Sequence, residues 1–242
     1  MNKETTVIEV HDLVKKFGDF TANDHLNFEV REGEIFGFLG ANGAGKTTAM
    51  RILCGLSLPT SGTIRVAGLD VYTQREAIKR RIGYMSQKFS LYEDLKVVEN
   101  IRLYAGIYGL RRKEIKLRTD QLLDTLGLET VRNKLISELP LGWRQKLAFS
   151  VAVIHRPSIV FLDEPTGGVD PITRRQFWDL IYEASRDGIT VFVTTHYMDE
   201  AEYCDRVSIM EAGRIEAIGS PSELMERYGA SNMDEVFIKI AR

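Results

Sequence analysis

Apolar and polar residues alternate, or nearly alternate, in two stretches near the start of the chain, 7–10 and 26–30. This period of two is typical of strands that bury one face. Residues 35–39 are instead continuously apolar, as expected of a strand that is buried on both faces. Two later stretches, 159–162 and 191–194, also predict strands.

Helical patterns lie between these predicted strands. Residues 46–54 are helix-compatible and are followed by Gly55, at a position where glycine often ends a helix. Residues 75–81 predict a short helix and residues 173–185 a longer one. Between about 97 and 128, apolar residues recur at spacings of three and four, and no strand is indicated. Strands that alternate with helices predict a parallel sheet covered on both faces, with the middle third inserted as a helical subdomain.

The composition fits a globular protein with one large α/β domain. The 242 residues are 44% apolar and 27% charged, which is ordinary for a soluble chain. The formal net charge of −2 argues against nucleic acid as a partner, because surfaces that bind it are usually strongly basic. No apolar run approaches the roughly 18 to 20 residues that span a bilayer, and no signal peptide is visible. Cys54 and Cys204 form no metal or redox motif. We therefore expect a cytoplasmic protein that reaches a membrane only through a partner.

One segment carries a specific chemical signal. It fits G-x-x-x-x-G-K-[ST], the P-loop that binds nucleotide phosphates, and consists of Gly40, Ala41, Asn42, Gly43, Ala44, Gly45, Lys46, Thr47 and Thr48. The backbone N–H groups of such a loop form an anion site, and the dipole of the following helix adds positive potential. We expect Lys46 to reach the β- and γ-phosphates of ATP and Thr47 to give its hydroxyl to Mg²⁺.

The apolar run at 159–162 leads into two carboxylates, Asp163 and Glu164. Ligands collect at the carboxyl ends of strands in open α/β sheets. Asp163 is therefore expected to hold Mg²⁺, and Glu164 to polarise the attacking water as a general base. Further on, residues 207–210 and 215–218 flank a short turn and predict a β-hairpin.

Three further motifs follow in a fixed order: Gly83-Tyr84-Met85-Ser86-Gln87, then Asp163-Glu164-Pro165-Thr166-Gly167-Gly168-Val169-Asp170-Pro171, then Thr194-Thr195-His196. Together with the P-loop, they make residues 8–219 resemble the ATP-binding subunit of an ABC transporter. The resemblance implies that Gln87 meets Mg²⁺ and the attacking water, and that His196 contacts the γ-phosphate. It also implies that Asp170 lies at a dimer interface. Phe17 sits where the family places an aromatic side chain that stacks on adenine.

The resemblance also implies a fold and a domain organisation. The fold class is α/β: a P-loop NTPase with a mostly parallel core sheet, an N-terminal antiparallel β subdomain and an inserted α-helical subdomain. Residues 1–242 are expected to form a single ABC ATPase domain. The RecA-like core and β subdomain would occupy about 1–87 and 151–242, and the helical subdomain about 88–150.

Within the superfamily, the segments at 195–202 and 234–239 resemble ABC-2 exporters of the multidrug or polysaccharide kind. This resemblance implies two partners, a transmembrane permease and a second nucleotide-binding domain, and a place on the inner face of the cell membrane. Residues after Gln87 are unusually apolar, namely Phe89, Leu91, Tyr92 and Leu95. They indicate either the core of the helical subdomain or a groove that receives a short helix of the permease.

The signature motif of the family, Leu-Ser-Gly-Gly-Gln, is altered. Leu139 and Gly142 match, but Pro140, Leu141 and Trp143 replace the serine, the first glycine and the glutamine. In the family this motif, including the position of Gly142, meets the γ-phosphate held by the other subunit. Proline brings neither a hydroxyl nor an N–H, and leucine adds bulk where glycine lets the backbone approach. A helix that begins near Trp143 would keep some affinity for anions. We expect weakened contact with the phosphate across the dimer.

Three functions therefore stay open. The first is an ATPase that powers an exporter, as a homodimer or as one half of an asymmetric pair. The second is a soluble ABC ATPase that acts outside transport, although no coiled-coil insertion or zinc motif is present. The third is a regulatory ATP-binding module with little turnover, which Pro140 and Leu141 motivate.

Overall fold

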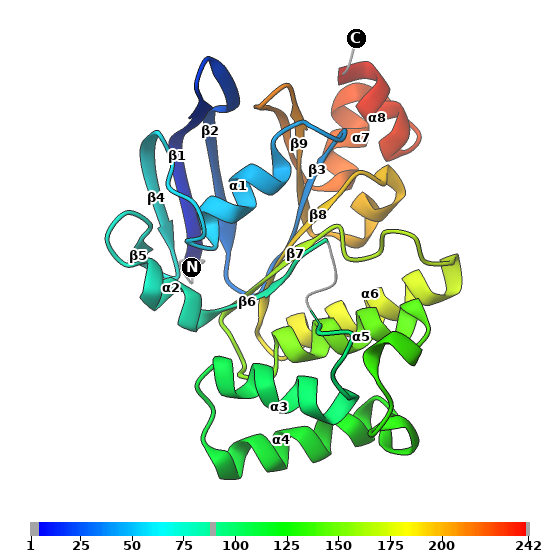
Figure 1. The fold of residues 1–242 in the computed structure, drawn as a ribbon. Helices are drawn as coiled ribbons and strands as arrows, with labels where there is room; N and C mark the ends of the chain where they lie inside the picture. The colour runs from blue at the N-terminus through cyan, green and yellow to red at the C-terminus, as the bar shows by residue number, and fades with distance from the viewer. Residues whose placement is uncertain (1–4, 88–90, 241–242) are drawn as a thin grey trace.

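The protein is described here by a computed structural model that covers residues 5–87 and 91–240. Its central sheet has the strand order β10-β9-β3-β8-β7-β6 (Figure 1). All neighbouring strands in it are parallel except β9 and β10, which form an antiparallel hairpin. The strands are β3 (Ile35–Gly40), β6 (Ile82–Met85), β7 (Ile159–Asp163), β8 (Thr190–Thr195), β9 (Arg206–Glu211) and β10 (Arg214–Gly219).

A second, antiparallel sheet has the order β2-β1-β4-β5. Its strands are β1 (Thr6–Phe17), β2 (Phe20–Arg31), β4 (Ser61–Val66) and β5 (Leu69–Asp70). Helix α1 (Lys46–Leu53) lies between the two sheets (Figure 1). The space beside it is filled by aromatic rings from both sheets, whose centroids are 5.2 to 6.2 Å apart: Phe28, Phe36, Phe38 and Phe192.

The central strands are apolar along their whole length because alternate residues enter two different cores. Phe36 of β3 and Phe161 of β7 face α1 and the antiparallel sheet. Leu39 and Leu162 of the same two strands face the opposite core, which α5 and α6 also fill. This double burial accounts for the continuous apolar runs in the sequence.

Helices α5 (Leu141–Ala152) and α6 (Pro171–Arg186) pack on this second face of the central sheet. Helix α3 (Val97–Ile107) packs against α5, and α4 (Arg112–Thr125) packs against α3, below the sheet in Figure 1. The remaining helices are α2 (Arg75–Arg81), α7 (Pro221–Tyr228) and α8 (Met233–Ile240), with 3-10 turns at Glu129–Val131, Ile136–Glu138 and Met198–Tyr203. No helix in the described parts of the chain is long and apolar enough to cross a membrane.

The predicted fold class is confirmed: a mostly parallel core sheet, an N-terminal antiparallel sheet and a group of helices between β6 and β7 are all present. Most predicted strands and helices are found within one to three residues of their expected ends, but β1 extends to Phe17 and β2 begins at Phe20, well beyond the predicted stretches 7–10 and 26–30. Sequence reasoning missed β4, β5, β6 and the two C-terminal helices. The boundaries of a separate helical subdomain at about 88–150 stay a prediction, because these helices share one continuous core with the sheet.

Candidate phosphate-binding site

The P-loop connects β3 to α1 and depends on glycine at two close approaches. A side chain at Gly40 would place its Cβ 2.4 Å from the carbonyl oxygen of Met210, and one at Gly45 would meet that of Ala22 at 2.3 Å. Both glycines also have positive φ, +153° and +103°, which L-residues with side chains rarely adopt. The loop is therefore pressed against its neighbours along its backbone.

Two neighbouring segments hold this loop by hydrogen bonds. The side-chain amide of Asn23, which is fully buried in β2, donates to the carbonyl oxygen of Gly45 at 3.1 Å. The backbone N–H of Gly213, in the β9–β10 turn, donates to the carbonyl oxygen of Ala44 at 3.1 Å. These bonds fix the end of the P-loop from which α1 begins.

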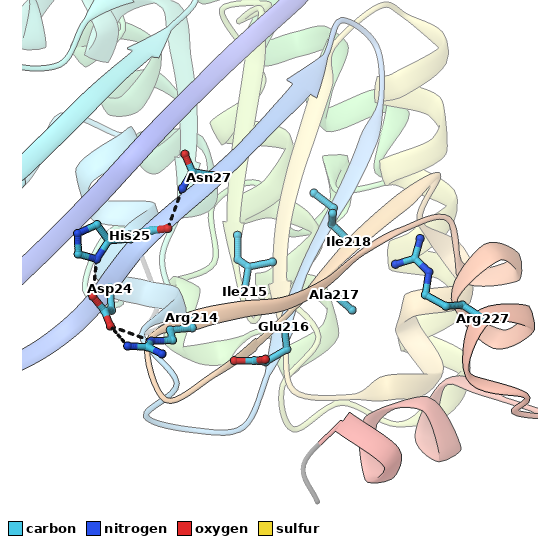
Figure 2. A pocket seen from close by; sticks show the side chains of 9 residues that line it. All are labelled: Asp24, His25, Asn27, Arg214, Ile215, Glu216, Ala217, Ile218 and Arg227. Carbon is cyan, nitrogen blue, oxygen red and sulfur yellow. Dashed lines mark hydrogen bonds and ion pairs between the residues drawn. The ribbon is translucent and has the colours of Figure 1, made fainter.

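An ion pair on the surface ties the same two segments together (Figure 2). The guanidinium of Arg214 lies 2.6 Å from the carboxylate of Asp24 and holds the pKa of Asp24 below its usual value. The backbone N–H of Asp24 also donates to the carbonyl oxygen of Gly213 at 2.8 Å. This pair lines a hollow of about 560 Å³ between β2 and β10. None of the predicted phosphate-binding residues lines that hollow, so the ion pair supports the P-loop from outside.

Lys46 begins α1 and turns its side chain back along the P-loop. Its Nζ donates to the carbonyl oxygens of Gly40 and Ala41 at 2.8 and 3.1 Å. It also lies 3.5 Å from Oε1 of Glu164. The side chain is 4% exposed, and this burial lowers the pKa of Lys46 below its usual value. The ammonium is therefore a buried positive charge inside the phosphate loop.

Asp163 ends β7 next to the start of α1. Its Oδ1 accepts hydrogen bonds from the hydroxyls of Thr47, at 3.1 Å, and Thr194, at 2.7 Å. Burial raises the pKa of Asp163, and the two hydroxyls act in the opposite direction. The hydroxyl of Thr47 and this carboxylate thus share one corner of the site, and both are oxygen donors of the kind that Mg²⁺ prefers.

Glu164 is the point at which the predicted catalytic residues meet. Its Oε2 accepts a hydrogen bond of 2.8 Å from the amide of Gln87 and lies 3.1 Å from Nδ1 of His196. Its other oxygen faces Lys46. The backbone of Glu164 has a φ of +47°, and its N–H donates to Thr194 at the end of β8. Residues that follow three parallel strands therefore converge with the P-loop lysine, as the order of the motifs predicted.

Two predicted site residues lie outside this cluster. Phe17 ends β1 and is 55% exposed, with the ammonium of Lys15 4.8 Å from the centre of its ring. Gly142 lies on α5, where a Cβ would meet Cγ2 of Thr173 at 2.5 Å. Gly142 therefore has a packing role within this chain, since it lets α5 and α6 approach closely.

The helix of the altered signature begins earlier than expected. α5 starts at Leu141, not near Trp143, and Pro140 is its N-cap residue. The backbone N–H groups of Trp143 and Arg144 donate to the carbonyl oxygen of Pro140. The φ of −56° and ψ of 151° at Pro140 suit both proline and the N-cap position, so proline starts the helix directly. Leu141 lines a cavity of about 200 Å³ that Gln87 and Glu164 also line.

Sequence reasoning missed the supporting roles of Asn23 and Thr194. Thr194 bonds both Asp163 and the backbone of Glu164. Its signal was available, because it is a polar residue at the carboxyl end of an otherwise apolar strand. No local pattern in the sequence singles out Asn23, and its role depends on contacts that only the fold creates.

Comparison with known proteins agrees with the geometry. The family described as ABC transporter matches residues 23–167. YbhF of Escherichia coli strain K12, a probable multidrug ABC transporter ATP-binding protein, is 46% identical over 240 residues, which are 97% of this chain and 42% of YbhF. The Nod factor export ATP-binding protein I of Cupriavidus metallidurans is 35% identical over 96% of this chain and 77% of its own length. A solved ATP-binding subunit of an ABC transporter has a TM-score of 0.87 at 28% identity, covering 98% of this chain and 100% of that one.

The chain belongs to the ABC transporter family and is an ATP-binding domain of that family. The resemblance seen in its motifs is thereby confirmed. The chain spans less than half the length of YbhF.

Proposed function

We propose that this chain is the ATP-hydrolysing subunit of an ABC exporter, which drives a substrate across the cytoplasmic membrane through a partner permease. The observation that carries the proposal is the convergence of Lys46, Gln87 and His196 on the carboxylate of Glu164. A site that only held nucleotide would need the P-loop but not a carboxylate placed among these three groups.

In this proposal the P-loop residues 40–48 bind the phosphates of ATP through their backbone N–H groups, and Lys46 pairs with the β- and γ-phosphates. Thr47, Asp163 and Gln87 would hold Mg²⁺, and the ion would neutralise negative charge that develops on the phosphates. No group of three or more His, Cys, Asp or Glu within the described residues could hold a metal by itself. Mg²⁺ in nucleotide sites commonly uses one or two carboxylates together with phosphate oxygens and water, and the Thr47–Asp163 corner fits that pattern.

Glu164 is the general base in this mechanism. A carboxylate that accepts hydrogen bonds from Gln87 is held in one orientation, and it polarises the water that attacks the γ-phosphate. His196 contacts the same phosphate, and its Nδ1 lies against the Glu164 oxygen that also accepts from Gln87. Phe17, exposed at the end of β1, stacks on adenine, and aromatic stacking is worth about 1–3 kcal/mol per base.

A second nucleotide-binding domain is part of the proposal. The altered signature, residues 140–143, stands at the start of α5 and is called the signature corner below. α5 packs on the face of the central sheet opposite to the one that α1 covers. In the proposal this corner meets phosphate held by another chain, either an identical copy or a domain with an ordinary signature. Asp170, at the N-cap of α6, lies close to this corner because Thr173 contacts Gly142.

The permease is proposed to dock beside α3, which also places the protein at the inner face of the membrane. A hollow of about 740 Å³ is lined there by both apolar and charged side chains, among them Tyr84, Ile107 and Tyr108. Ile107 is 62% exposed. The described residues that predicted a groove do not line this hollow: Leu91 is buried in the core, Leu95 is half-buried and Tyr92 is 51% exposed. Phe89 lies outside the described residues.

The test is phosphate release from the purified chain and from Glu164→Gln, with ATP binding measured in parallel. Loss of a general base slows hydrolysis by about 100- to 10,000-fold, while the P-loop keeps its affinity for ATP. Equal, near-zero rates in both proteins would favour a regulatory ATP-binding module, a second candidate that the substitutions Pro140 and Leu141 support. Purification from native membranes in mild detergent would show whether a permease comes with the chain.

A further inference from the structure

A buried carboxylate lies between the loops that carry Glu164 and His196. It belongs to Glu200, in the 3-10 turn Met198–Tyr203, and Glu200 is 0% exposed. Its Oε1 accepts a hydrogen bond of 2.5 Å from the hydroxyl of Thr166, which is 1% exposed. Nε of Arg174, from α6, lies 3.5 Å from the same oxygen. Among the residues that the structure describes, the other oxygen of Glu200 has no hydrogen-bond partner.

Stability alone does not account for this residue. Removing a carboxylate from water costs several kcal/mol, and replacing a buried ion pair by well-packed apolar side chains is often neutral or stabilising. An apolar residue at position 200 would fill the same space between the 3-10 turn Met198–Tyr203 and α6 without that cost. The charge is therefore better explained by the groups that it holds in place.

On one side, Glu200 holds the turn that carries Glu164. Thr166 lies two residues after Glu164, and the N–H of Gly167 closes this turn by donating to the carbonyl oxygen of Glu164 at 3.2 Å. The hydrogen bond from Thr166 to Glu200 links this turn to the loop after β8, and both of its side chains are buried.

On the other side, Glu200 is tied to the loop that carries His196. The N–H of Glu200 donates to the carbonyl oxygen of Tyr197 at 3.3 Å, and Tyr197 follows His196 directly. The guanidinium of Arg174 lies 4.4 Å from the centre of the Tyr197 ring. Arg174 therefore contacts both the carboxylate and the residue next to His196.

We propose that Glu200 is a positioning residue for ATP hydrolysis. By binding Thr166 and Arg174 at one oxygen, it fixes the spacing of the two loops and thereby the 3.1 Å contact between His196 and Glu164. This inference rests on the proposed function. Glu200 itself touches neither Glu164 nor His196 among the contacts of the described residues, and it acts through the two loops.

The test compares Glu200→Gln, which keeps the shape and removes the charge, with Thr166→Val, which removes only the hydroxyl. Both are expected to lower kcat about 10- to 100-fold, because small displacements of catalytic groups have effects of this size. The KM for ATP stays within about twofold, since the P-loop is untouched, and Thr166→Ser restores kcat. The matched control is Asp199→Asn: Asp199 pairs with the same Arg174 at 3.2 Å but is 63% exposed, and its loss leaves kcat unchanged.

A double-mutant cycle separates positioning from a general loss of structure. If Glu200 acts through the spacing of the two loops, Glu200→Gln lowers kcat by less than about twofold in a His196→Ala background. The inference is overturned if the decrease in kcat caused by Glu200→Gln is as large in the His196→Ala background as in the native chain. It is also overturned if Glu200→Gln lowers only the Tm and leaves kcat unchanged. Where Glu200→Gln does not fold, the Thr166→Val and Thr166→Ser pair decides. If the proposed function itself is wrong, His196→Ala and Glu164→Gln leave phosphate release unchanged in the otherwise native chain.

Discussion

The phosphate site and the signature corner differ in how much of each a single chain completes. At the phosphate site, Lys46 and Glu164 are 4% and 9% exposed and have several partners within the chain. At the signature corner, Trp143 is 41% exposed and Ile172, at the start of α6, is 73% exposed. The polar groups of the first region are paired within a single chain, whereas the second region presents large apolar side chains outward. The proposed function accounts for this difference, because it assigns ATP binding to one chain and efficient hydrolysis to a pair of chains.

The largest effect is expected from Lys46→Ala, which removes the buried ammonium from the phosphate site. The buried ammonium would lose its bonds to charged phosphate oxygens, each worth about 1.5–3 kcal/mol, so ATP should bind about 100-fold more weakly. Equilibrium binding of a fluorescent ATP analogue measures this loss. Lys79→Ala is the control, because Lys79 pairs with Glu76 on the surface of α2. Unchanged affinity in Lys46→Ala would mean that the P-loop of this chain does not hold the phosphates in the proposed way.

Restoring the family's signature motif at the signature corner should raise the rate of ATP hydrolysis. Pro140→Ser combined with Leu141→Gly returns a hydroxyl and a close backbone approach, and one hydrogen bond to a charged group corresponds to a rate increase of about 10-fold or more. Phosphate release by the isolated protein, measured over a range of protein concentrations, reports the gain. Since serine suits the N-cap geometry already present at Pro140, α5 should still form. An unchanged rate would contradict the hypothesis that the altered signature limits hydrolysis.

The same contrast governs what the sequence predicts. The phosphate site was predictable because its residues lie in short motifs directly after buried strands, and parallel strands bring their carboxyl ends together. Glu164 and Gln87 are 77 residues apart in sequence but hydrogen-bonded in space, as that rule requires. The apolar runs likewise predicted β3, β7 and β8, since few other structures bury every residue of a short segment.

The supporting residues were not predictable in the same way. Asn23, Thr166 and Glu200 are polar and almost fully buried, but their partners come from other elements, and no local spacing indicates them. The helix α7 was missed although Ser220 and Glu223 form a capping box at its start and Pro221 is its first residue. The buried polar residues depend on tertiary contacts, which the sequence does not display. The start of α7, in contrast, is marked by a local sequence signal.

Gly142→Ala should separate the packing role of this glycine from its expected contact with phosphate. The new Cβ would lie 2.5 Å from Cγ2 of Thr173, and Thr173 cannot turn freely because its hydroxyl donates to Asp170 at 2.6 Å. Overpacking of this kind costs about 1–3 kcal/mol, which thermal unfolding would detect. Adding Thr173→Ser removes Cγ2 and keeps the hydroxyl, so stability should return. Stability that stays low in the double variant would show that α5 and α6 are not limited by this contact.

The smallest effect is expected on the pH dependence of the free energy of unfolding. It arises just after the C-terminal end of α5, away from the phosphate site and the signature corner. His155 stacks on Tyr108 with ring centres 3.9 Å apart, and its Nε2 is hydrogen-bonded to the carbonyl oxygen of Ile82. Burial lowers the pKa of His155 from 6.5 to about 4. The unfolded chain therefore binds a proton between these values that the folded chain does not. The stability contributed by neutral His155 is fully present above pH 6.5 and is lost as the pH falls towards 4.

After allowance for solvent screening of this partly exposed ring, the loss should be about 1–2 kcal/mol. Urea unfolding at pH 7.5, 6 and 5 would measure it against His155→Phe, which keeps the stacking on Tyr108 but cannot titrate. Carboxylates titrate in both proteins, so the difference between the two curves isolates the histidine. If both proteins lose stability equally between pH 6.5 and 5, His155 is charged in the folded protein and the packing of α3 against β6 does not depend on its neutral form. If the free energy of unfolding falls more steeply with pH in the native chain than in His155→Phe, the acid sensitivity lies at this junction of α5 with the sheet. The phosphate site and the signature corner would then not be its source.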